Sequence, residues 1–346
     1  MHYLLIDSSY LQYRSYFAYP NLTNTSGKHL GAIYGFIKSI LAFQKTYKPD
    51  FIIFAKDLSG PTFRDEFYDA YKAGRLPTPP ELKEQISEIH EFLDLVGAAT
   101  LGKAGYEADD MIATSTFSLI YNPSEGEILS DKLEYNTDPD SPFIQSKTLD
   151  QIQNQVTIFS GDRDLYQLLA MPNVQMLISD RMGSTKLLAK DDFIEKYELD
   201  PAQWLDYKAL VGDSSDNIKG VPGVGPKTAT TLLQDHGSLA DIYKHLGVDF
   251  VAHLNHGITY TNHQTSAQTK KPIAEKLAMK LVENLDNVVL SYRLSKLAFP
   301  VVEIENKAWD LSKAINKLQE WQFKSIIKEL KLEDVAETKP QQNSLF

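Results

Sequence analysis

The stretch Tyr3-Leu4-Leu5-Ile6-Asp7 is a short apolar run that ends at an aspartate. Two later runs have the same form and are each followed closely by an aspartate: Asp50–Phe54 before Asp57, and Val156–Phe159 before Asp162. Short apolar runs bounded by turn residues are typical of the buried strands of a parallel sheet. Helical stretches such as Gly31–Tyr47 and Glu81–Val96 separate them. The sequence therefore predicts an α/β fold.

The aspartates after these runs indicate a site. In open α/β sheets, ligands bind in the crevice outside the carboxyl ends of the strands. Asp7, Asp57 and Asp162 each follow a predicted strand, so we expect them to meet at that edge. Further carboxylates lie at predicted element ends, where each also has an explanation as a helix cap or turn residue. They are Glu107, Asp109, Asp110, Asp164, Asp213 and Asp216.

Nine converging carboxylates would repel one another strongly unless cations neutralised them. The chain contains no cysteine, which excludes disulfides, a thiol nucleophile and a cysteine zinc site. Oxygen ligands suit Mg²⁺ or Mn²⁺. The net charge of -11 argues against a generic nucleic-acid binder. Without the nine acids the charge is -2, so most of the acidity would belong to a metal site and a nucleic-acid substrate is not excluded.

Two segments are candidates for binding phosphate. Gly220–Ala229 (GVPGVGPKTA) predicts a tight hairpin and a helix start, whose backbone N–H groups attract a phosphate beside Lys227. Arg64, Lys72 and Arg75 are interleaved with aromatic residues, a pattern that grips a nucleic-acid strand. The alternatives are a glycine turn without a ligand and a solvated helix face. Together with a carboxylate metal site, phosphate contacts indicate phosphodiester hydrolysis.

The length of 346 residues predicts two domains, or one large domain with an appendage. We expect the α/β domain over residues 1–203, with a polar surface insertion at about 122–155. A helical region follows over 204–332, and 333–346 is predicted to be a flexible tail. No apolar run approaches the roughly 20 residues that span a bilayer, and the first run meets Asp7 too early for a signal peptide. We therefore expect a cytoplasmic protein without membrane contacts.

Read together, these segments resemble the bacterial 5′-3′ exonuclease and flap endonuclease family, of the type that many DNA polymerase I chains carry at the amino terminus. The resemblance runs from Tyr3 to about Leu332, with the motifs in the family's order. The motifs are Leu5-Ile-Asp7 with Tyr13-Arg14, Phe63-Arg64, Tyr71–Arg75 (YKAGR), Gly105–Asp110 (GYEADD), Gly161–Leu168 (GDRDLYQL), Gly212–Asn217 (GDSSDN) and Gly220–Ala229.

This resemblance implies a PIN-like nuclease domain with a helical arch at about residues 60–80, and a helix-hairpin-helix-like DNA-binding motif at 213–235. It makes all nine carboxylates ligands of two or more Mg²⁺ or Mn²⁺ ions. It assigns stabilisation of the scissile phosphate to Lys72 and Arg75. The residues that it assigns to DNA binding are Arg14, Arg64, Tyr71, Gly223, Gly225 and Lys227.

Within that DNA-binding set, Tyr71 would stack on a terminal base, and Arg14 and Arg64 would steer phosphates. The glycine hairpin would bind the duplex backbone, in this family often through a monovalent cation such as K⁺. One departure concerns Asp57, which follows Phe54-Ala-Lys56, whereas the family usually has its aspartate directly after the strand. Asp57 is therefore aligned by its spacing to Arg64. No polymerase sequence follows Leu332, so we expect a free-standing nuclease.

The function that the resemblance implies is that of a structure-specific 5′ nuclease acting on 5′ flaps, nicks and RNA primers in DNA replication and repair. Two alternatives remain at this point. A metal-dependent ribonuclease acting on structured RNA would have little use for the duplex-binding hairpin. A catalytically silent DNA-junction binder would be expected to lack some of the nine carboxylates, which are all present.

The last residues of the sequence indicate a partner. Gln342-Asn-Ser-Leu345-Phe346 resembles the short peptide by which bacterial replication and repair proteins dock on the sliding clamp. Leu345 and Phe346 form an apolar pair that no nearby core could bury, and Gln342 could make polar contacts. The alternative is a disordered end that happens to finish in two apolar residues. We therefore predict clamp binding through this peptide.

Overall fold

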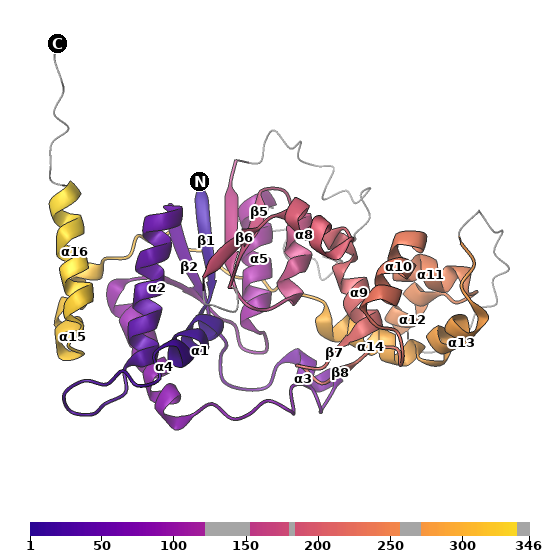
Figure 1. Ribbon diagram of the computed structural model, residues 1–346, viewed down its shortest axis with the longest axis horizontal. Coiled ribbons are helices and arrows are strands. Elements are labelled where there is room, and N and C mark those ends of the chain that lie inside the picture. The colour runs from indigo at the N-terminus through magenta and orange to yellow at the C-terminus, as the bar shows by residue number, and fades with distance from the viewer. Residues whose placement is uncertain (122–152, 180–183, 257–270, 338–346) are drawn as a thin grey trace, which may run out of the picture.

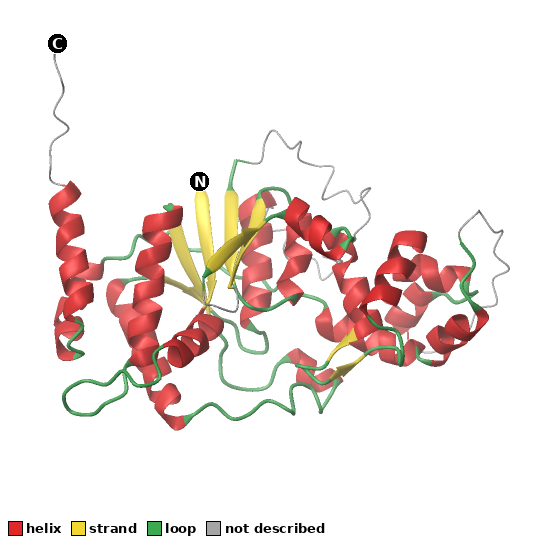
Figure 2. Cartoon of the chain, in the orientation of Figure 1, coloured by secondary structure: helices red, strands yellow, loops and turns green. Residues whose placement is uncertain are grey.

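The computed structural model describes residues 1–121, 153–179, 184–256 and 271–337. Within these ranges, six strands form one sheet in the order β3-β2-β1-β4-β5-β6. They are β1 (His2–Asp7), β2 (Phe51–Ala55), β3 (Ala99–Leu101), β4 (Gln155–Phe159), β5 (Val174–Ser179) and β6 (Thr185–Leu188). Neighbours are parallel except β6, which is antiparallel to β5. The three apolar runs are the adjacent strands β2, β1 and β4, so the predicted parallel sheet is confirmed (Figure 2).

Helices cover both faces of this sheet, which is why its central strands are apolar without alternation. They are α1 (Ser8–Ala18), α2 (Gly31–Tyr47), α4 (Pro80–Val96), α5 (Ala108–Tyr121) and α8 (Lys190–Tyr197). Leu4 and Ile6 of β1 belong to the core that includes α2 and α4. Tyr3 and Leu5, from the opposite face of the strand, belong to the core that includes α5. The four apolar side chains of β1 thus pack alternately into one or the other of two core layers.

The strand order reverses direction beside β1. From β1 the chain continues to β2 and β3 on one side, and then crosses to β4 on the other side of β1. Ligand sites of open α/β sheets lie at such a point, outside the carboxyl ends of the strands. Gly161 lies in the turn after β4, where a Cβ atom would come within 2.3 Å of the Tyr10 ring. The close approach of α1 to this turn therefore requires glycine.

A helical region follows the short helices η2 (Asp164–Ala170) and η3 (Pro201–Gln203). It consists of α9 (Trp204–Val211), the hairpin β7 (Gly212–Asp213) with β8 (Ile218–Lys219), α10 (Pro226–His236), α11 (Leu239–His245), α12 (Phe250–His256), α13 (Glu275–Glu283) and α14 (Leu285–Ser295). The predicted glycine turn is present, since Val224 N–H donates to the Val221 carbonyl and Gly223 has φ +80°. Helix α10 begins directly after Gly225, as the sequence predicts.

The segment predicted to form a helical arch is helical only in its first part, α3 (Phe63–Phe67). Turns and extended backbone connect α3 to α4. Prolines at 77, 79 and 80 explain this in part, because proline disfavours helical backbone in the residue before it. Lys72 also has a left-handed backbone, with φ 55°. In this structure the arch is therefore an irregular strap between α3 and α4.

The end of the described chain returns to the α/β domain. After η4 (Leu311–Ala314), helices α15 (Ile315–Glu320) and α16 (Lys324–Glu337) lie beside α2, at the opposite end of the molecule from α13 (Figure 1). Leu318, Trp321 and Ile326 belong to the core that includes α2 and α4. The predicted boundaries are wrong here, because this segment packs on the α/β domain and α16 extends past residue 333. The sequence did not show which core these apolar residues would join.

Two predicted segments cannot be compared with the structure. The insertion at 122–155 lies almost entirely, and the peptide at 342–346 entirely, outside the described residues. Within the described ranges, no helix combines the length and apolar composition needed to cross a bilayer.

Candidate active site

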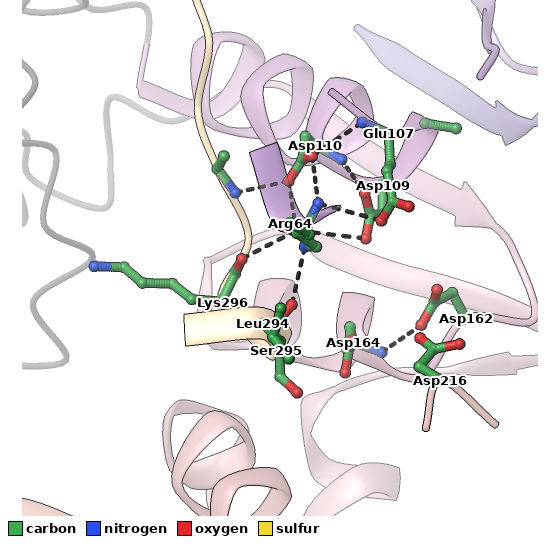
Figure 3. Close-up of polar contacts among 12 residues, drawn as sticks. Arg64, Glu107, Asp109, Asp110, Asp162, Asp164, Asp216, Leu294, Ser295 and Lys296 are labelled. Atoms are coloured by element: carbon green, nitrogen blue, oxygen red, sulfur yellow. Dashed lines mark hydrogen bonds and ion pairs between the residues drawn. The ribbon is translucent and has the colours of Figure 1, made fainter. Parts of the chain in front are cut away.

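Five segments carry the predicted carboxylates to the crevice beside β1 and β4. Figure 3 shows the acids of α5 lying opposite those that follow β4. The acids are Asp7 at the end of β1, Asp57 after β2, Glu107, Asp109 and Asp110 at the start of α5, Asp162 and Asp164 after β4, and Asp213 and Asp216 in the β7–β8 hairpin. The strand order thus brings carboxylates that are distant in the sequence to the same edge of the sheet.

The charge of Asp162 affects three other carboxylates in this crevice, those of Asp7, Asp109 and Asp164. Burial, followed by the charges of Asp57 and Asp162, raises the pKa of Asp7 to about 7, against hydrogen bonds from Tyr10 N–H and the Ser160 hydroxyl. Burial also raises the pKa of Asp164 to about 7, with Asp162 contributing. The pKa of Asp109 is raised well above its ordinary value by burial, then by Asp110, with a smaller contribution from Asp162.

Lysine and arginine side chains of the protein lie among these acids. The Lys72 ammonium is 2.5 Å from Glu107, and the Arg75 guanidinium is 2.6 Å from Asp216. Lys208 pairs with Asp164 at 2.8 Å and also contacts Asp213. In the described part of the chain, no three acidic or histidine side chains are arranged to hold a metal ion. In this state basic side chains contact several of the predicted ligands, and the assignment of all nine acids to metal ions stays a prediction.

The donor chemistry of the crevice nevertheless fits a hard divalent cation. Its candidate ligands are carboxylate oxygens, which Mg²⁺ and Mn²⁺ prefer. Asp7 and Asp109 hold protons more tightly than isolated aspartates because burial disfavours their charged forms, and repulsion by neighbouring carboxylates adds to this effect. A divalent cation would relieve this repulsion in the same way as a proton. The residues present therefore fit the expected metal ions.

Asp57 reaches the site although it lies beyond the end of its strand. The register of β1 and β2 places Ala55 beside Asp7. The Asp57 carboxylate accepts hydrogen bonds from the Ser9 hydroxyl at 2.6 Å and from Ala108 N–H at 2.8 Å. It therefore binds the start of α5, where it contributes to raising the pKa of Asp7. Although Asp57 does not directly follow its strand in the sequence, its position in the structure is thus compatible with its predicted role as a metal ligand.

Two predicted DNA-binding side chains are not at the surface. Arg64 is 1% exposed and donates to the carboxylates of Glu107 and Asp110. The Tyr71 ring is buried beside Ile218 and Leu294, and its hydroxyl donates to Glu107. In this structure Arg64 therefore cannot steer phosphates, and the Tyr71 ring cannot stack on a base. Ion pairing with buried carboxylates explains the position of Arg64, and burial in an apolar cluster explains that of Tyr71.

The other predicted DNA contacts are more accessible. Lys227 is exposed on the first turn of α10, beside Gly225. Gly223 is exposed at the turn before it. The Arg14 guanidinium lies 5.6 Å from the centre of the Phe159 ring and is half-buried. The hairpin therefore presents the positive charge of Lys227 to solvent, and its role in DNA binding stays a prediction.

Sequence reasoning missed Lys208. Its side chain is 6% exposed on α9, between Asp164 and Asp213. Although burial opposes it, the charges of these two acids raise the pKa of Lys208 above its ordinary value. The signal available in the sequence was a lysine within an apolar helix, five residues before an acidic turn. Lys208 keeps the acids of two different segments together.

The crowding of these acids predicts a pH-dependent stability of the metal-free protein. Folded-state pKa values of about 7 for Asp7 and Asp164 exceed the ordinary value of 3.8, so the stability that they contribute is complete at low pH and lost as pH rises towards 7. We expect Asp162→Asn to raise the melting temperature by several degrees at pH 8 and to have less effect at pH 5. Scanning fluorimetry in EDTA measures this difference, and equal shifts at both pH values would contradict it.

Comparison with known proteins identifies the family. Residues 2–131 match the model of the 5′-3′ exonuclease N-terminal resolvase-like domain, and residues 199–317 match that of the 5′-3′ exonuclease C-terminal SAM fold. The 5′-3′ exonuclease of Aquifex aeolicus is 31% identical over 348 residues, which cover 99% of this chain and 98% of that protein. DNA polymerase I of Thermus thermophilus is 39% identical over 249 residues, 70% of this chain. The chain matches about a quarter of the length of that polymerase (25%).

Solved structures agree on the fold. T5 5′-exonuclease with bound zinc has a TM-score of 0.57 and 22% identity, covering 86% of this chain and 90% of that one. The catalytic core of Rad2 in complex with a DNA substrate has a TM-score of 0.51 and 14% identity, covering 92% and 87%. The predicted α/β nuclease domain followed by a helical region is confirmed. By its family models and its near-full-length relative, this chain belongs to the 5′-3′ exonuclease family of nucleases.

Proposed function

We propose that this protein is a cytoplasmic, structure-specific 5′ nuclease that hydrolyses phosphodiester bonds at 5′ flaps, nicks and RNA primers during DNA replication and repair. The observation that carries the proposal is the crevice beside β1 and β4, where carboxylates with raised pKa values alternate with basic side chains. Relatives support it: the T5 D15 flap endonuclease has been solved as a pseudo-enzyme-product complex with DNA and metal ions.

Asp7, Asp109 and Asp162 would hold Mg²⁺ or Mn²⁺, joined by Glu107 once Lys72 is released from it. When bound, two or more such ions supply an activated water and neutralise charge at the reacting phosphate. Lys72 and Arg75, freed from their acidic partners, would then donate to the same phosphate as negative charge develops on it. Hydrolysis would leave a 5′-phosphate and a 3′-hydroxyl.

The glycine hairpin would hold the duplex at a distance from the chemistry. The start of α10 after Gly225 offers N–H groups, and Lys227 adds an exposed charge. Such contacts bind phosphate without reading base sequence. A K⁺ ion at this hairpin stays a prediction. Arg14, beside Phe159 near the crevice, would contribute a further phosphate contact.

The proposal is tested with 5′-labelled flap, nicked and RNA-primed duplexes, each in Mg²⁺, Mn²⁺ or EDTA. We expect short metal-dependent products from all three substrates, and none from a hairpin RNA without DNA. Preferential cleavage of the RNA would favour the ribonuclease alternative. DNA binding without cleavage in either metal would favour the silent junction binder.

We further propose that the peptide Gln342–Phe346 docks this nuclease on the bacterial sliding clamp. A tether of this kind raises the effective concentration of the enzyme at its sites without changing the active site. Deleting residues 342–346 is therefore expected to leave cleavage of free flaps unchanged and to remove stimulation by the cognate clamp. Calorimetry with the clamp measures the contact directly. Equal affinity of the full-length and truncated chains would show that these residues do not bind it.

A further inference from the structure

Arg64 is the most fully buried basic residue of the site, and each of its three nitrogens is used. Nε donates to the Leu294 carbonyl at 2.9 Å, and Nη2 donates to the Lys296 carbonyl at 3.0 Å (Figure 3). Nη1 and Nη2 also donate to the two oxygens of Asp110, at 2.8 and 2.9 Å. A last contact joins Nη1 to Glu107 at 3.2 Å. One side chain thus joins three segments.

Asp110, the counter-ion of Arg64, has no acceptor capacity left for another ligand. Its Oδ1 accepts from Arg64 Nη2 and from Ala298 N–H at 2.8 Å. Its Oδ2 accepts from Arg64 Nη1 and from Glu107 N–H at 3.1 Å. A carboxylate has about four acceptor positions, and these four bonds fill them. The side chain is also 0% exposed, so a metal ion could reach it only by breaking this network.

Asp109, the next residue along the chain, is different. Its Oδ1 accepts one hydrogen bond, from Asp110 N–H at 2.7 Å, and its Oδ2 lies 3.9 Å from Arg64. Adjacent aspartates at the start of α5 therefore have different surroundings: one is saturated, and the other has acceptor positions available.

The backbone contacts of Arg64 connect this acidic turn to the helical region. Leu294 is in the last turn of α14, whose carbonyls have no partner within the helix. A guanidinium there satisfies one of them and complements the negative end of the helix dipole. Helix α14 packs closely on α9, which leads through the β7–β8 hairpin towards the glycine turn. Arg64 therefore fixes the helical region relative to Glu107 and Asp109.

We propose that Arg64 is a positioning residue for the metal site, and that Asp110 is its counter-ion and not a metal ligand. This inference rests on the proposed metal-dependent nuclease function. The Arg64–Asp110 pair sets the spacing between the acids of α5 and the helical region that holds DNA. Groups that orient metal ligands in this way are worth about 10- to 100-fold in metal affinity when they are removed.

The test is a titration of Mn²⁺ into the full chain without DNA. Calorimetry and the electron paramagnetic resonance signal of free Mn²⁺ measure the number of bound ions and their affinity. We expect Asp109→Asn to bind fewer Mn²⁺ ions than the wild type. Asp110→Asn and Arg64→Lys should bind the wild-type number, about 10- to 100-fold more weakly. Lysine keeps the charge but lacks the planar fork that binds both oxygens of Asp110.

A paired substitution separates positioning from stability. Arg64→Gln with Asp110→Asn removes both charges but keeps polar groups that can hydrogen-bond to the surrounding backbone carbonyls and N–H groups, which an apolar pair would leave without partners. We expect this variant to keep a wild-type circular dichroism spectrum and to bind duplex DNA in EDTA, yet to lose Mn²⁺ affinity. The control is Lys38→Gln with Glu329→Gln, which removes an ion pair between α2 and α16 and should leave Mn²⁺ binding unchanged.

Two results would overturn the inference. Loss of a bound ion in Asp110→Asn, as in Asp109→Asn, would make Asp110 a ligand. Wild-type Mn²⁺ affinity in Arg64→Lys, or in the folded paired variant, would leave Arg64 a purely structural residue. Failure of the proposed function has a separate signature, because the wild-type protein itself would then bind no Mn²⁺ or cleave no flap.

Discussion

Asp162→Asn is expected to lower the single-turnover rate of flap cleavage by at least about a thousandfold, while DNA affinity in EDTA stays within about threefold of wild type. The carboxylate of Asp162 lies close enough to Asp7, Asp109 and Asp164 to influence the pKa of each. A metal ion shared by these acids would lose a central ligand. The exposed hairpin around Lys227, which would hold the duplex, is unchanged.

A half-buried aspartate outside the crevice offers a matched control. Asp206 on α9 also has a pKa raised by burial to about 7, and it accepts a hydrogen bond from Leu239 N–H. Asparagine can accept the same bond, so Asp206→Asn should cleave at the wild-type rate. Rapid-quench measurements with enzyme in excess compare the two variants. Metal-dependent cleavage near the wild-type rate in Asp162→Asn, or equal losses in both variants, would remove Asp162 from the site.

The sheet and its acidic edge were predictable because their signals are local. A strand buried on both faces must be apolar throughout, so the runs that became β1, β2 and β4 were visible one by one. An aspartate at or soon after each strand end places an acid at the crevice, whatever the distance between the strands in the chain. The glycine turn before α10 was equally local, because Gly223 needs positive φ.

The surroundings of Arg64 were not predictable in this way. Helix α3 is too short to show an apolar face, so the sequence did not indicate that Arg64 points inward. Its Leu294 partner lies 230 residues away and contributes a backbone carbonyl, which every residue has. Similarly, nothing local to the sequence places Trp321 of the last segment in the core beside α2. Contacts of this kind depend on tertiary packing.

The second large effect is expected at the strap between α3 and α4. Lys72→Ala should lower the saturated single-turnover rate by about 100-fold and change DNA affinity by less than about threefold. Lys72 lies against Glu107, among the acids that would bind metal, and the charges of Glu107 and Asp109 raise its pKa although burial opposes this. Its charge is therefore available at the place where negative charge develops on the phosphate, and not along the duplex.

Lys227→Ala is the matching substitution at the hairpin, and it should have the opposite pattern. Lys227 is exposed on α10, outside the acidic crevice. Loss of one phosphate contact should weaken binding and reduce the slope of log affinity against log salt by about 0.9, with the saturated rate unchanged. A third variant, Lys45→Ala, removes an exposed lysine from the last turn of α2 and should alter neither quantity. Because all three variants replace lysine by alanine, the same loss in Lys72→Ala and Lys227→Ala would contradict the separation of phosphate chemistry at the strap from duplex binding at the hairpin.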